Sequence, residues 1–359
     1  MASLLDTFEP FKLKNRSVMA PMTRYECSHS GIPSKELQDY YIRRSENNIG
    51  LIIIESAAIN DTNSIGYCNG LQFHNKEHLK TWTKVIDQIH QNGSKVFIQL
   101  FHPGRLTVSK LTNGRVLAPS AIKTHDAQSF WRPQVNGEIV HFQTKTPYKT
   151  PSEITESEIN TVIQDFKKAS SLAIEAGFDG VEIHGAHGYL IHQFCHKSCN
   201  SRIDKYAAES FLFVREIIKS IRNNIPADAV LSFRLSQHMV DNSYIRFSED
   251  KYDIRKLVTS IDKLGVDVFH CSEIKANSNL FGTNKSLISL VQSATNKSII
   301  ACGEICDIQT ANNLLSMEQV ELIAFGRLLI NNPKLMDLLQ NNPRLIIPFD
   351  YHTHINKVY

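Results

Sequence analysis

Two imidazoles and a phenol follow one short apolar run within six positions: His184, His187 and Tyr189. The apolar run at residues 181–184 is typical of a buried strand, and the two small residues after His184 turn the chain. An imidazole can donate a hydrogen bond to a substrate oxygen, and a phenol can donate a proton. Each residue alone is more simply explained by packing or by a turn. The three together at one strand end favour chemistry.

Polar groups also end several other strand-length apolar runs. Four of them are hydrogen-bonding side chains, namely Thr23, Ser56, Gln99 and Arg234. Such groups suit the edge of a flat heteroaromatic ring that carries carbonyl oxygens and ring nitrogens. Gly303, Gly326 and Arg327 follow the last two runs, where α/β barrels hold a phosphate with backbone N–H groups and a cation. FMN has both parts, so the pattern predicts an FMN site in which Arg234 stabilises negative charge on the reduced ring.

A metal site has little support in the sequence. Only His184 and His187 converge, without a carboxylate cluster from a second strand. The seven cysteines include two close pairs, Cys195/Cys199 and Cys302/Cys306, and neither pair is a C-x-x-C. An odd number of cysteines in a long chain argues against a disulfide scaffold. We therefore predict no metal, and a cytoplasmic protein in a reducing compartment.

Composition excludes other classes of protein. The chain has 359 residues, of which 42% are hydrophobic and 21% charged, as in ordinary globular proteins. Its formal charge of +3 is small and no basic stripe appears, which argues against a nucleic-acid partner. No apolar run approaches the ~20 residues of a membrane span, and the first residues lack the apolar core of a signal peptide. We expect small-molecule partners.

The apolar runs predict the fold. Eight nearly continuous runs of strand length lie at residues 18–20, 51–54, 96–100, 181–184, 230–235, 266–270, 299–301 and 322–325. Helical patterns separate them at residues 77–92, 155–176, 209–223, 254–264, 284–293, 307–315 and 333–340. The clearest helix starts at a Thr155/Glu158 capping box and stops at Gly177. Alternating strands and helices predict an α/β protein, a closed (β/α)8 TIM barrel that forms one domain over residues 1–359.

One segment interrupts this alternation after the third strand. Residues 101–154 lack a strong helical period, and excursions of this length are often lids or binding loops. We predict a lid-like excursion in which Phe130, Trp131, Gly137 and Val140 belong to a hairpin over the barrel mouth. The alternative is a surface segment that has no role in the site.

These strand ends resemble the Old Yellow Enzyme family of FMN-dependent ene-reductases, over about residues 4–339. The resemblance is strongest in five segments, each at a strand end: KNRSVMAPMTRY (14–25), QLFHPGR (99–105), AGFDGVEIHGAHGYLIHQF (176–194), FRLS (233–236) and AFGRLLINNP (324–333). The chain resembles the classical branch of the family, which has threonine at the position of Thr23, whereas another branch has cysteine there.

The resemblance implies a role for each matching residue. Eight fall where the family binds FMN: Pro21, Thr23, Ser56, Gln99, Arg234, Gly303, Gly326 and Arg327. His184 and His187 would bind the carbonyl or nitro oxygen of the substrate, and Tyr189 would donate the proton. Tyr67 and Tyr25 would line the substrate site. The implied reaction is reduction of electrophilic alkenes by NAD(P)H, with NADPH favoured, in a monomer or homodimer.

Two regions depart from the family pattern. The segment at residues 200–211 is about three residues shorter than in relatives, and the tail at residues 348–359 matches poorly. Two other functions remain open. One is a different FMN-barrel oxidation, of amines or hydroxy acids, against which the set of His184, His187 and Tyr189 argues. The other is a non-catalytic barrel that binds flavin, or nothing, as a binding protein, against which the FMN set as a whole argues.

Overall fold

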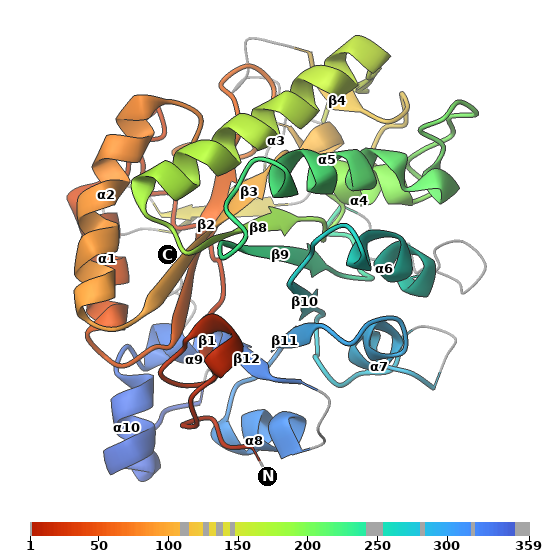
Figure 1. Ribbon diagram of the computed structural model, residues 1–359. Coiled ribbons are helices and arrows are strands. Elements are labelled where there is room, and N and C mark those ends of the chain that lie inside the picture. The colour runs from red at the N-terminus through yellow and green to blue at the C-terminus, as the bar shows by residue number, and fades with distance from the viewer. Residues whose placement is uncertain are drawn as a thin grey trace.

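Eight parallel strands close into a barrel in the computed structural model, in the order β1-β12-β11-β10-β9-β8-β3-β2 (Figure 1). They are β1 (Ser17–Met19), β2 (Leu51–Ala58), β3 (Lys95–Phe101), β8 (Gly180–His184), β9 (Val230–Leu235), β10 (Val268–Ser272), β11 (Ser298–Cys302) and β12 (Leu322–Phe325). Each coincides with a predicted apolar run, so the predicted TIM barrel is confirmed. The structure describes residues 2–107, 115–124, 129–133, 139–143, 148–241, 254–280, 284–316 and 320–348.

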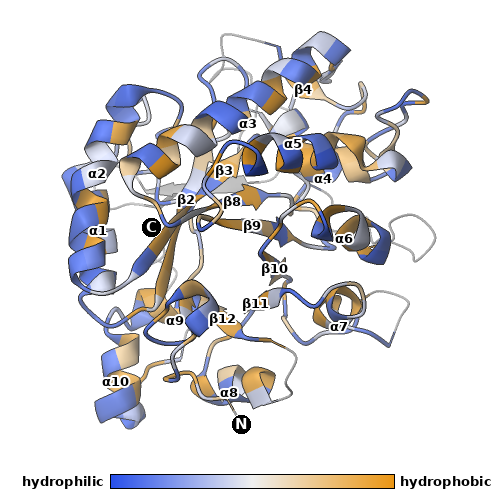
Figure 2. Cartoon of the chain, in the orientation of Figure 1, coloured by the Kyte–Doolittle hydropathy of each residue, from blue (hydrophilic) through white to orange (hydrophobic). Residues whose placement is uncertain are grey.

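Helices surround the barrel, and they turn their hydrophobic residues toward the mainly hydrophobic strands (Figure 2). They are α1 (Lys35–Ser45), α2 (Lys76–Gln91), α3 (Glu156–Ala176), α4 (Leu190–Cys195), α5 (Leu212–Arg222), α6 (Ile254–Asp262), α7 (Leu287–Gln292), α8 (Ile308–Ser316), α9 (Arg327–Asn331) and α10 (Leu335–Asn341). The sequence did not predict α1, α4 or α9. The last two have six and five residues, which is too short for a helical period to show.

Local sequence signals set where helices begin and end. Thr155 and Glu158 form the predicted capping box of α3, and Gly177 ends that helix at φ 103°. The predicted start of α5 at residue 209 is wrong. A short 3-10 helix, η3 (Ala208–Ser210), comes first, and Phe211 then takes a left-handed φ of 50° before α5 begins at Leu212. These residues lie within the segment at 200–211 that is expected from the sequence to depart from the family pattern.

The interior of the barrel changes from apolar to polar along its axis. An apolar layer near the start of the strands includes Phe97, Val268 and Ile300, and the N-terminal hairpin that pairs Phe8 with Leu13 packs against it. The next layer is polar and has no solvent exposure, and its members are Gln99, Glu182, Ser232 and His270. Glu182 accepts hydrogen bonds from the other three. Buried charges need such partners, so this layer is fixed in one arrangement.

The excursion after β3 contains two small sheets. Strand β4 (Leu117–Ala118) pairs in parallel with β7 (Ser152–Glu153), and β5 (Ser129–Pro133) pairs antiparallel with β6 (Ile139–Gln143). The predicted hairpin is therefore confirmed for three of its four residues, whereas Gly137 lies outside the described residues. Its role as a lid stays a prediction.

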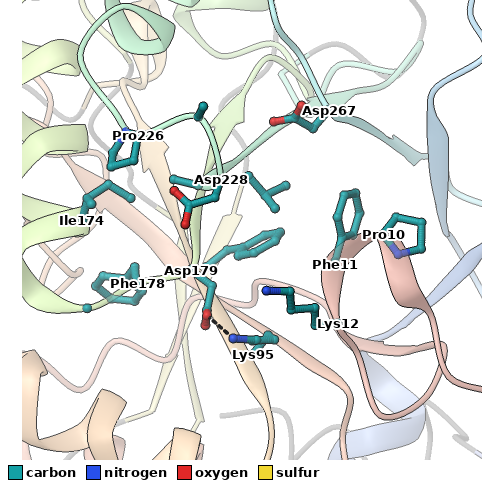
Figure 3. A pocket seen from close by; sticks show the side chains of 15 residues that line it. Pro10, Phe11, Lys12, Lys95, Ile174, Phe178, Asp179, Pro226, Asp228 and Asp267 are labelled. Atoms are coloured by element: carbon teal, nitrogen blue, oxygen red, sulfur yellow. Dashed lines mark hydrogen bonds and ion pairs between the residues drawn. The ribbon is translucent and has the colours of Figure 1, made fainter.

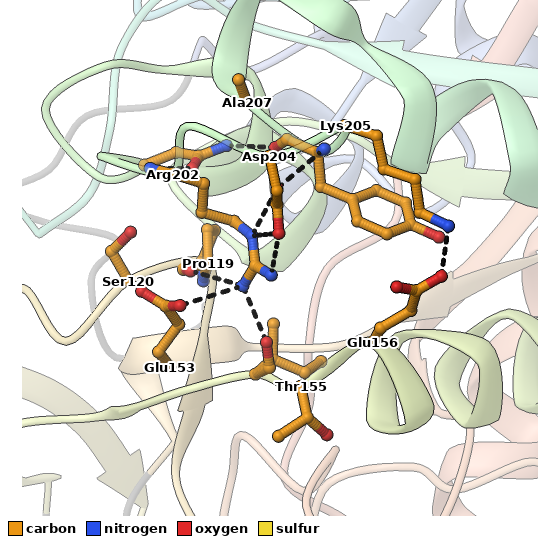
Figure 4. A network of polar contacts seen from close by, with 12 residues as sticks. Pro119, Ser120, Glu153, Thr155, Glu156, Arg202, Asp204, Lys205 and Ala207 are labelled. Carbon is orange, nitrogen blue, oxygen red and sulfur yellow. Dashed lines mark hydrogen bonds and ion pairs between the residues drawn. The ribbon is translucent and has the colours of Figure 1, made fainter.

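Arg202 ties the excursion to the segment that follows α4 (Figure 4). Its Nη1 donates to the carbonyl oxygens of Pro119, at 3.2 Å, and of Ile154, at 2.7 Å. Its Nη2 pairs with Asp204 at 2.5 Å, and the side-chain hydrogen bond to Asp204 raises the pKa of the guanidinium. The segment that follows α4 is thus anchored by polar contacts.

Within the described part of the chain, no helix is long and apolar enough to cross a membrane. All seven cysteines are free thiols. Among the same described residues, no group of three or more His, Cys, Asp or Glu side chains is arranged to hold a metal ion.

Candidate active site

The turn after β8 carries the predicted catalytic residues. His184 is the last residue of β8, and His187 and Gly188 both take left-handed backbone conformations, at φ 61° and 83°. The His187 N–H donates to Ser236 Oγ at 2.8 Å and fixes the turn. A Cβ at Gly188 would lie 2.9 Å from Asp241 Oδ1, so only glycine lets the chain pass there. Tyr189 then precedes the first residue of α4.

The aromatic rings of the predicted residues gather at this turn. The ring centroid of His184 lies 5.3 Å from that of His187 and 4.9 Å from that of Tyr189. The hydroxyls of Tyr189 and Tyr67 share a short hydrogen bond. Tyr25 meets the Tyr67 ring edge-on at 5.7 Å. The structure therefore brings together all five residues that the sequence places on the substrate side.

Sequence reasoning missed two aromatic residues of the same cluster. Phe101 stacks in parallel on Tyr67 at 5.7 Å and meets Tyr189 edge-on at 4.7 Å. Tyr148 is buried in the same cluster. It lies in the excursion, where no periodic pattern assigns a residue to a face. For Phe101 the sequence did offer a signal, because this residue stands two positions after Gln99 at the end of the same strand, β3.

Burial sets the protonation state of these groups. Burial lowers the pKa of His184 and of His187 well below the usual range, and the nearby charge of Arg234 lowers both further. Both imidazoles are therefore neutral near pH 7, and each has one N–H to donate. Burial raises the pKa of Tyr189, which keeps its phenol protonated. The site thus offers two neutral donors and an acid.

Arg234 lies next to the imidazoles and is only 7% exposed. Its Nη2 donates to Ser272 Oγ at 3.0 Å, and His187 Nε2 lies 3.1 Å from the same oxygen. Ser272 therefore links the two residues, a role that the sequence did not indicate. Arg234 Nε is buried and has no hydrogen-bond partner in the described structure. A buried donor of this kind fits the ring nitrogen or carbonyl of a flavin.

The polar layer of the barrel orients two further predicted FMN residues. Ser56 Oγ donates to Gln99 Oε1 at 2.7 Å, and Gln99 Nε2 donates to Glu182 Oε1 at 2.7 Å. These bonds fix which end of the Gln99 amide faces which neighbour. The sequence predicted that Ser56 follows the strand. In the structure it lies inside β2, which is irregular there because its register against β3 shifts between Ile54 and Ala57.

The loop after β1 carries Pro21, which is buried, and Thr23, which is half-buried. A buried carboxylate that the sequence did not single out as functional holds this loop. Glu55 Oε1 accepts from the backbone N–H of Arg24 at 3.1 Å, and Glu55 Oε2 accepts from the Tyr41 hydroxyl at 3.1 Å. Burial raises the pKa of Glu55 to about 7. The position of Thr23 therefore depends on contacts from two neighbouring elements.

The predicted phosphate residues lie at the ends of β11 and β12, which are neighbours in the barrel. Gly303 takes a φ of 140°, and a Cβ there would lie 2.2 Å from the Glu273 carbonyl oxygen. Gly326 precedes α9, whose first residue is Arg327. Only glycine fits at position 303 beside the Glu273 backbone, and Arg327 supplies a cation at the neighbouring strand end, as phosphate binding requires. With the unpartnered Arg234 Nε, these residues fit FMN.

A cavity of about 530 Å³ lies at the opposite end of the barrel (Figure 3). The first residues of β3 and β9 line it, together with the N-terminal hairpin. Its Asp179 pairs with Lys95 at 2.7 Å, and its Asp267 pairs with Arg222 at 3.2 Å. Chemistry in (β/α)8 barrels occurs at the carboxyl ends of the strands, so this cavity is not the candidate site.

The fold is a closed (β/α)8 barrel, and its strand ends carry hydrogen-bond donors, an acid and a buried arginine. This is the architecture of a barrel oxidoreductase that binds a flat cofactor. The family model described as NADH:flavin oxidoreductase / NADH oxidase family matches residues 7–345. The chain belongs to this family, as the Old Yellow Enzyme resemblance predicts. It is therefore an FMN-dependent oxidoreductase that uses a nicotinamide reductant.

Individual relatives agree with this assignment. The chain is 31% identical to an NADPH dehydrogenase of Clostridium acetobutylicum, over 91% of each chain. It is 32% identical to an NADPH dehydrogenase of Bacillus subtilis, over 91% of this chain and 90% of the relative. The fold is similar to that of the old yellow enzyme homologue from Zymomonas mobilis, with a TM-score of 0.84, 24% identity, and coverage of 99% of this chain and 96% of that one.

Proposed function

We propose that this protein is an ene-reductase, which reduces the activated C=C bond of α,β-unsaturated carbonyl or nitro compounds at the expense of NAD(P)H, with NADPH favoured. The observation that carries the proposal is the cluster of His184, His187 and Tyr189. The ring centroid of His184 lies 5.3 Å from that of His187 and 4.9 Å from that of Tyr189. Two neutral N–H donors beside a protonated phenol match the needs of this reaction.

His184 and His187 bind the substrate oxygen in this proposal. Negative charge develops on that oxygen as the C=C bond is reduced, and two fixed donors stabilise it without reorganisation. Both side chains are held in place, since His187 Nε2 contacts Ser272 and the His184 ring contacts Phe101 at 5.8 Å. Neutral imidazoles also avoid repulsion with the neighbouring Arg234.

Tyr189 donates the proton to the carbon next to the activating group. Tyr67 hydrogen-bonds the Tyr189 oxygen, and this bond lowers the pKa of Tyr189 against the larger effect of burial. Tyr67 therefore stabilises the phenolate that remains after proton transfer. The edge contact of Tyr25 on Tyr67 fits the substrate-side role of both residues.

Eight residues hold FMN in this proposal: Pro21, Thr23, Ser56, Gln99, Arg234, Gly303, Gly326 and Arg327. FMN held by these residues would supply the hydride-transfer chemistry between the nicotinamide and the alkene. Arg234 would orient the ring through its unpartnered buried Nε, and Gln99 from its fixed position in the polar layer. Arg327 would supply a cation for the phosphate beside Gly326. We further propose one barrel domain over residues 1–359 with small-molecule partners in the cytoplasm, which the free thiols support.

One experiment separates this function from its alternatives. The purified protein is expected to be yellow, to bleach anaerobically with NADPH and to recover its colour when 2-cyclohexenone is added. Bleaching without recovery on addition of the enone would favour oxidation of amines or hydroxy acids. A colourless protein that does not bind added FMN would favour the non-catalytic alternative.

A further inference from the structure

His187 contacts two serines, of which Ser236 holds its backbone and Ser272 contacts its ring. Ser272 is the last residue of β10, and its Oγ lies 3.1 Å from His187 Nε2. The same oxygen accepts a hydrogen bond from Arg234 Nη2 at 3.0 Å. Ser272 is only 4% exposed, so protein groups rather than bulk water have to satisfy its hydroxyl. Strands β8, β9 and β10, which position these side chains, are neighbours in the barrel.

The direction of the hydrogen bond between Ser272 and His187 follows from the donors and acceptors that meet there. A hydroxyl has one proton and two acceptor sites, and a guanidinium can only donate. Arg234 therefore fills one acceptor site of the Ser272 oxygen, and the hydroxyl proton needs an acceptor of its own. His187 Nε2 is the nitrogen within reach. The sulfur of Cys302, at the paired position of β11, is a weaker acceptor than an imidazole nitrogen.

The opposite direction of this hydrogen bond is unfavourable. A proton on His187 Nε2 and the Arg234 donor would fill both acceptor sites of the Ser272 oxygen. The hydroxyl proton would then lack a nitrogen or oxygen acceptor among the described residues, and a buried donor without a partner is costly. Burial and the charge of Arg234 keep the pKa of His187 well below its usual range, so the ring carries one proton. That proton therefore belongs on Nδ1.

His184 carries its proton on the other ring nitrogen. Its Nδ1 accepts a hydrogen bond from the backbone N–H of Ala186 at 3.3 Å, and a backbone N–H can only donate. Burial lowers the pKa of His184 as well, so the single proton of its neutral ring is on Nε2. The two imidazoles thus present different nitrogens as donors, Nε2 of His184 and Nδ1 of His187. Within the described residues, neither of these two nitrogens makes a hydrogen bond.

We propose that Ser272 is a positioning residue that sets the tautomer of His187, so that Nδ1–H is the donor this imidazole offers to the substrate oxygen. Arg234 determines the direction, because its guanidinium fills one acceptor site of the serine and its charge polarises the hydroxyl. His238 holds the plane of the ring. Its own ring lies 4.8 Å from that of His187, and its Nδ1 lies 3.3 Å from Glu273 Oε2. That the donor serves a substrate oxygen rests on the proposed function, whereas the tautomer does not.

The tautomer is measured on the full-length protein with bound FMN and isotopically labelled histidine. A two-bond proton–nitrogen correlation spectrum distinguishes a protonated ring nitrogen from a bare one, and the signals lost in His187→Gln assign this residue. In the wild-type protein near pH 7 we expect a bare Nε2 and a protonated Nδ1 at His187. A protonated Nε2 would overturn the proposal, and this outcome needs no variant of the serine.

Two variants at position 272 test the serine itself. Ser272→Ala removes the hydroxyl and should give a mixture of His187 tautomers, whereas Ser272→Thr keeps a hydroxyl and should keep Nε2 bare. Ser170→Ala is the matched control, because it removes a buried hydroxyl that donates to the Lys167 carbonyl oxygen within α3 at 2.7 Å. It should leave the spectrum of His187 unchanged. A wild-type tautomer in Ser272→Ala would overturn the role of the serine.

Kinetics connect the tautomer to the substrate. The KM for 2-cyclohexenone should rise about fivefold in Ser272→Ala, which is the usual worth of one hydrogen bond, and Ser272→Thr should restore it. Ser170→Ala should have the KM of the wild-type enzyme. A Ser272→Ala enzyme with mixed tautomers and an unchanged KM would contradict the link to the substrate oxygen. Failure of the proposed function is distinguishable, because it would appear as loaded enzyme that the enone does not reoxidise, whatever the tautomer of His187.

Discussion

The hydroxyl of Tyr189 hydrogen-bonds the hydroxyl of Tyr67 across 122 positions of sequence. Tyr189 lies in the turn after β8, whereas Tyr67 lies in the loop after β2. Phe101 packs against both rings. The contact joins the proposed acid to a second phenol within one buried aromatic cluster. In the proposed reaction, proton donation by Tyr189 is therefore coupled to Tyr67, which lies far from it in the sequence.

Replacement of Tyr189 by phenylalanine should separate the two halves of the reaction. Loss of a general acid typically costs about 10²- to 10⁴-fold in rate. We expect this loss in reoxidation by 2-cyclohexenone and little change in reduction by NADPH, both followed by stopped-flow absorbance of the flavin. Equal slowing of both steps would remove Tyr189 from the proton-donor role.

Replacement of Tyr67 by phenylalanine should have a smaller effect on the same step. The lost hydrogen bond is worth about 1 kcal/mol, or about fivefold in rate, because Tyr189 itself remains. Reoxidation by the enone should slow by this factor, with NADPH reduction unaffected. Tyr206→Phe is a matched control, since its hydroxyl bonds Glu216 away from the site. A Tyr67→Phe enzyme with normal reoxidation would show that the contact is only structural.

The two site imidazoles should make substrate binding insensitive to mild acid. Burial lowers the pKa of His184 and His187 well below 6.5, so neither gains a proton between pH 8 and pH 6. KM for an enone should therefore be constant over this range, measured at saturating NADPH. A change in KM with a midpoint near 6.5 would indicate that at least one of these imidazoles titrates as an exposed histidine does.

Gly303→Ala should weaken FMN binding. The added Cβ would lie 2.2 Å from the Glu273 carbonyl oxygen, and a φ of 140° is unfavourable for alanine. The loop must shift, and we expect the Kd for FMN to rise at least about tenfold in a fluorescence titration. Gly93→Ala is the control, because it has a φ of 74° but its Cβ comes no closer than 3.8 Å to Lys14. Equal Kd values for both variants would argue against a phosphate site at Gly303.

Asp241→Asn should destabilise the fold. Asp241 pairs with Arg105 at 2.6 Å, and the two side chains are 0% and 1% exposed. Breaking a buried pair leaves an uncompensated charge and costs about 3–5 kcal/mol of unfolding free energy. Chemical denaturation measures the loss. Asp39→Asn, which breaks the exposed pair with Lys35, should change stability little. A similar small effect at Asp241 would contradict the prediction.

The sequence predicted the barrel because its signals are local. Strands buried on both faces require continuous apolar runs, and all eight were visible. The capping box at Thr155 and the stop at Gly177 set the ends of α3 in the same way. The short helices α4 and α9 escaped because six or five residues carry no measurable period. The start of α5 was misplaced because the left-handed Phe211 leaves no signature in residue type.

The sequence by itself also determined which residues stand at the strand ends, since parallel strands in a closed barrel all present their carboxyl ends on one face. Only the tertiary structure decided how those residues contact one another. The Ser272 link between Arg234 and His187, the contact of Glu55 with the loop of Thr23, and the pair of Glu182 with His270 all join separate elements of the fold. Strand order and register set such contacts, because they bring together side chains that no local pattern in the sequence relates.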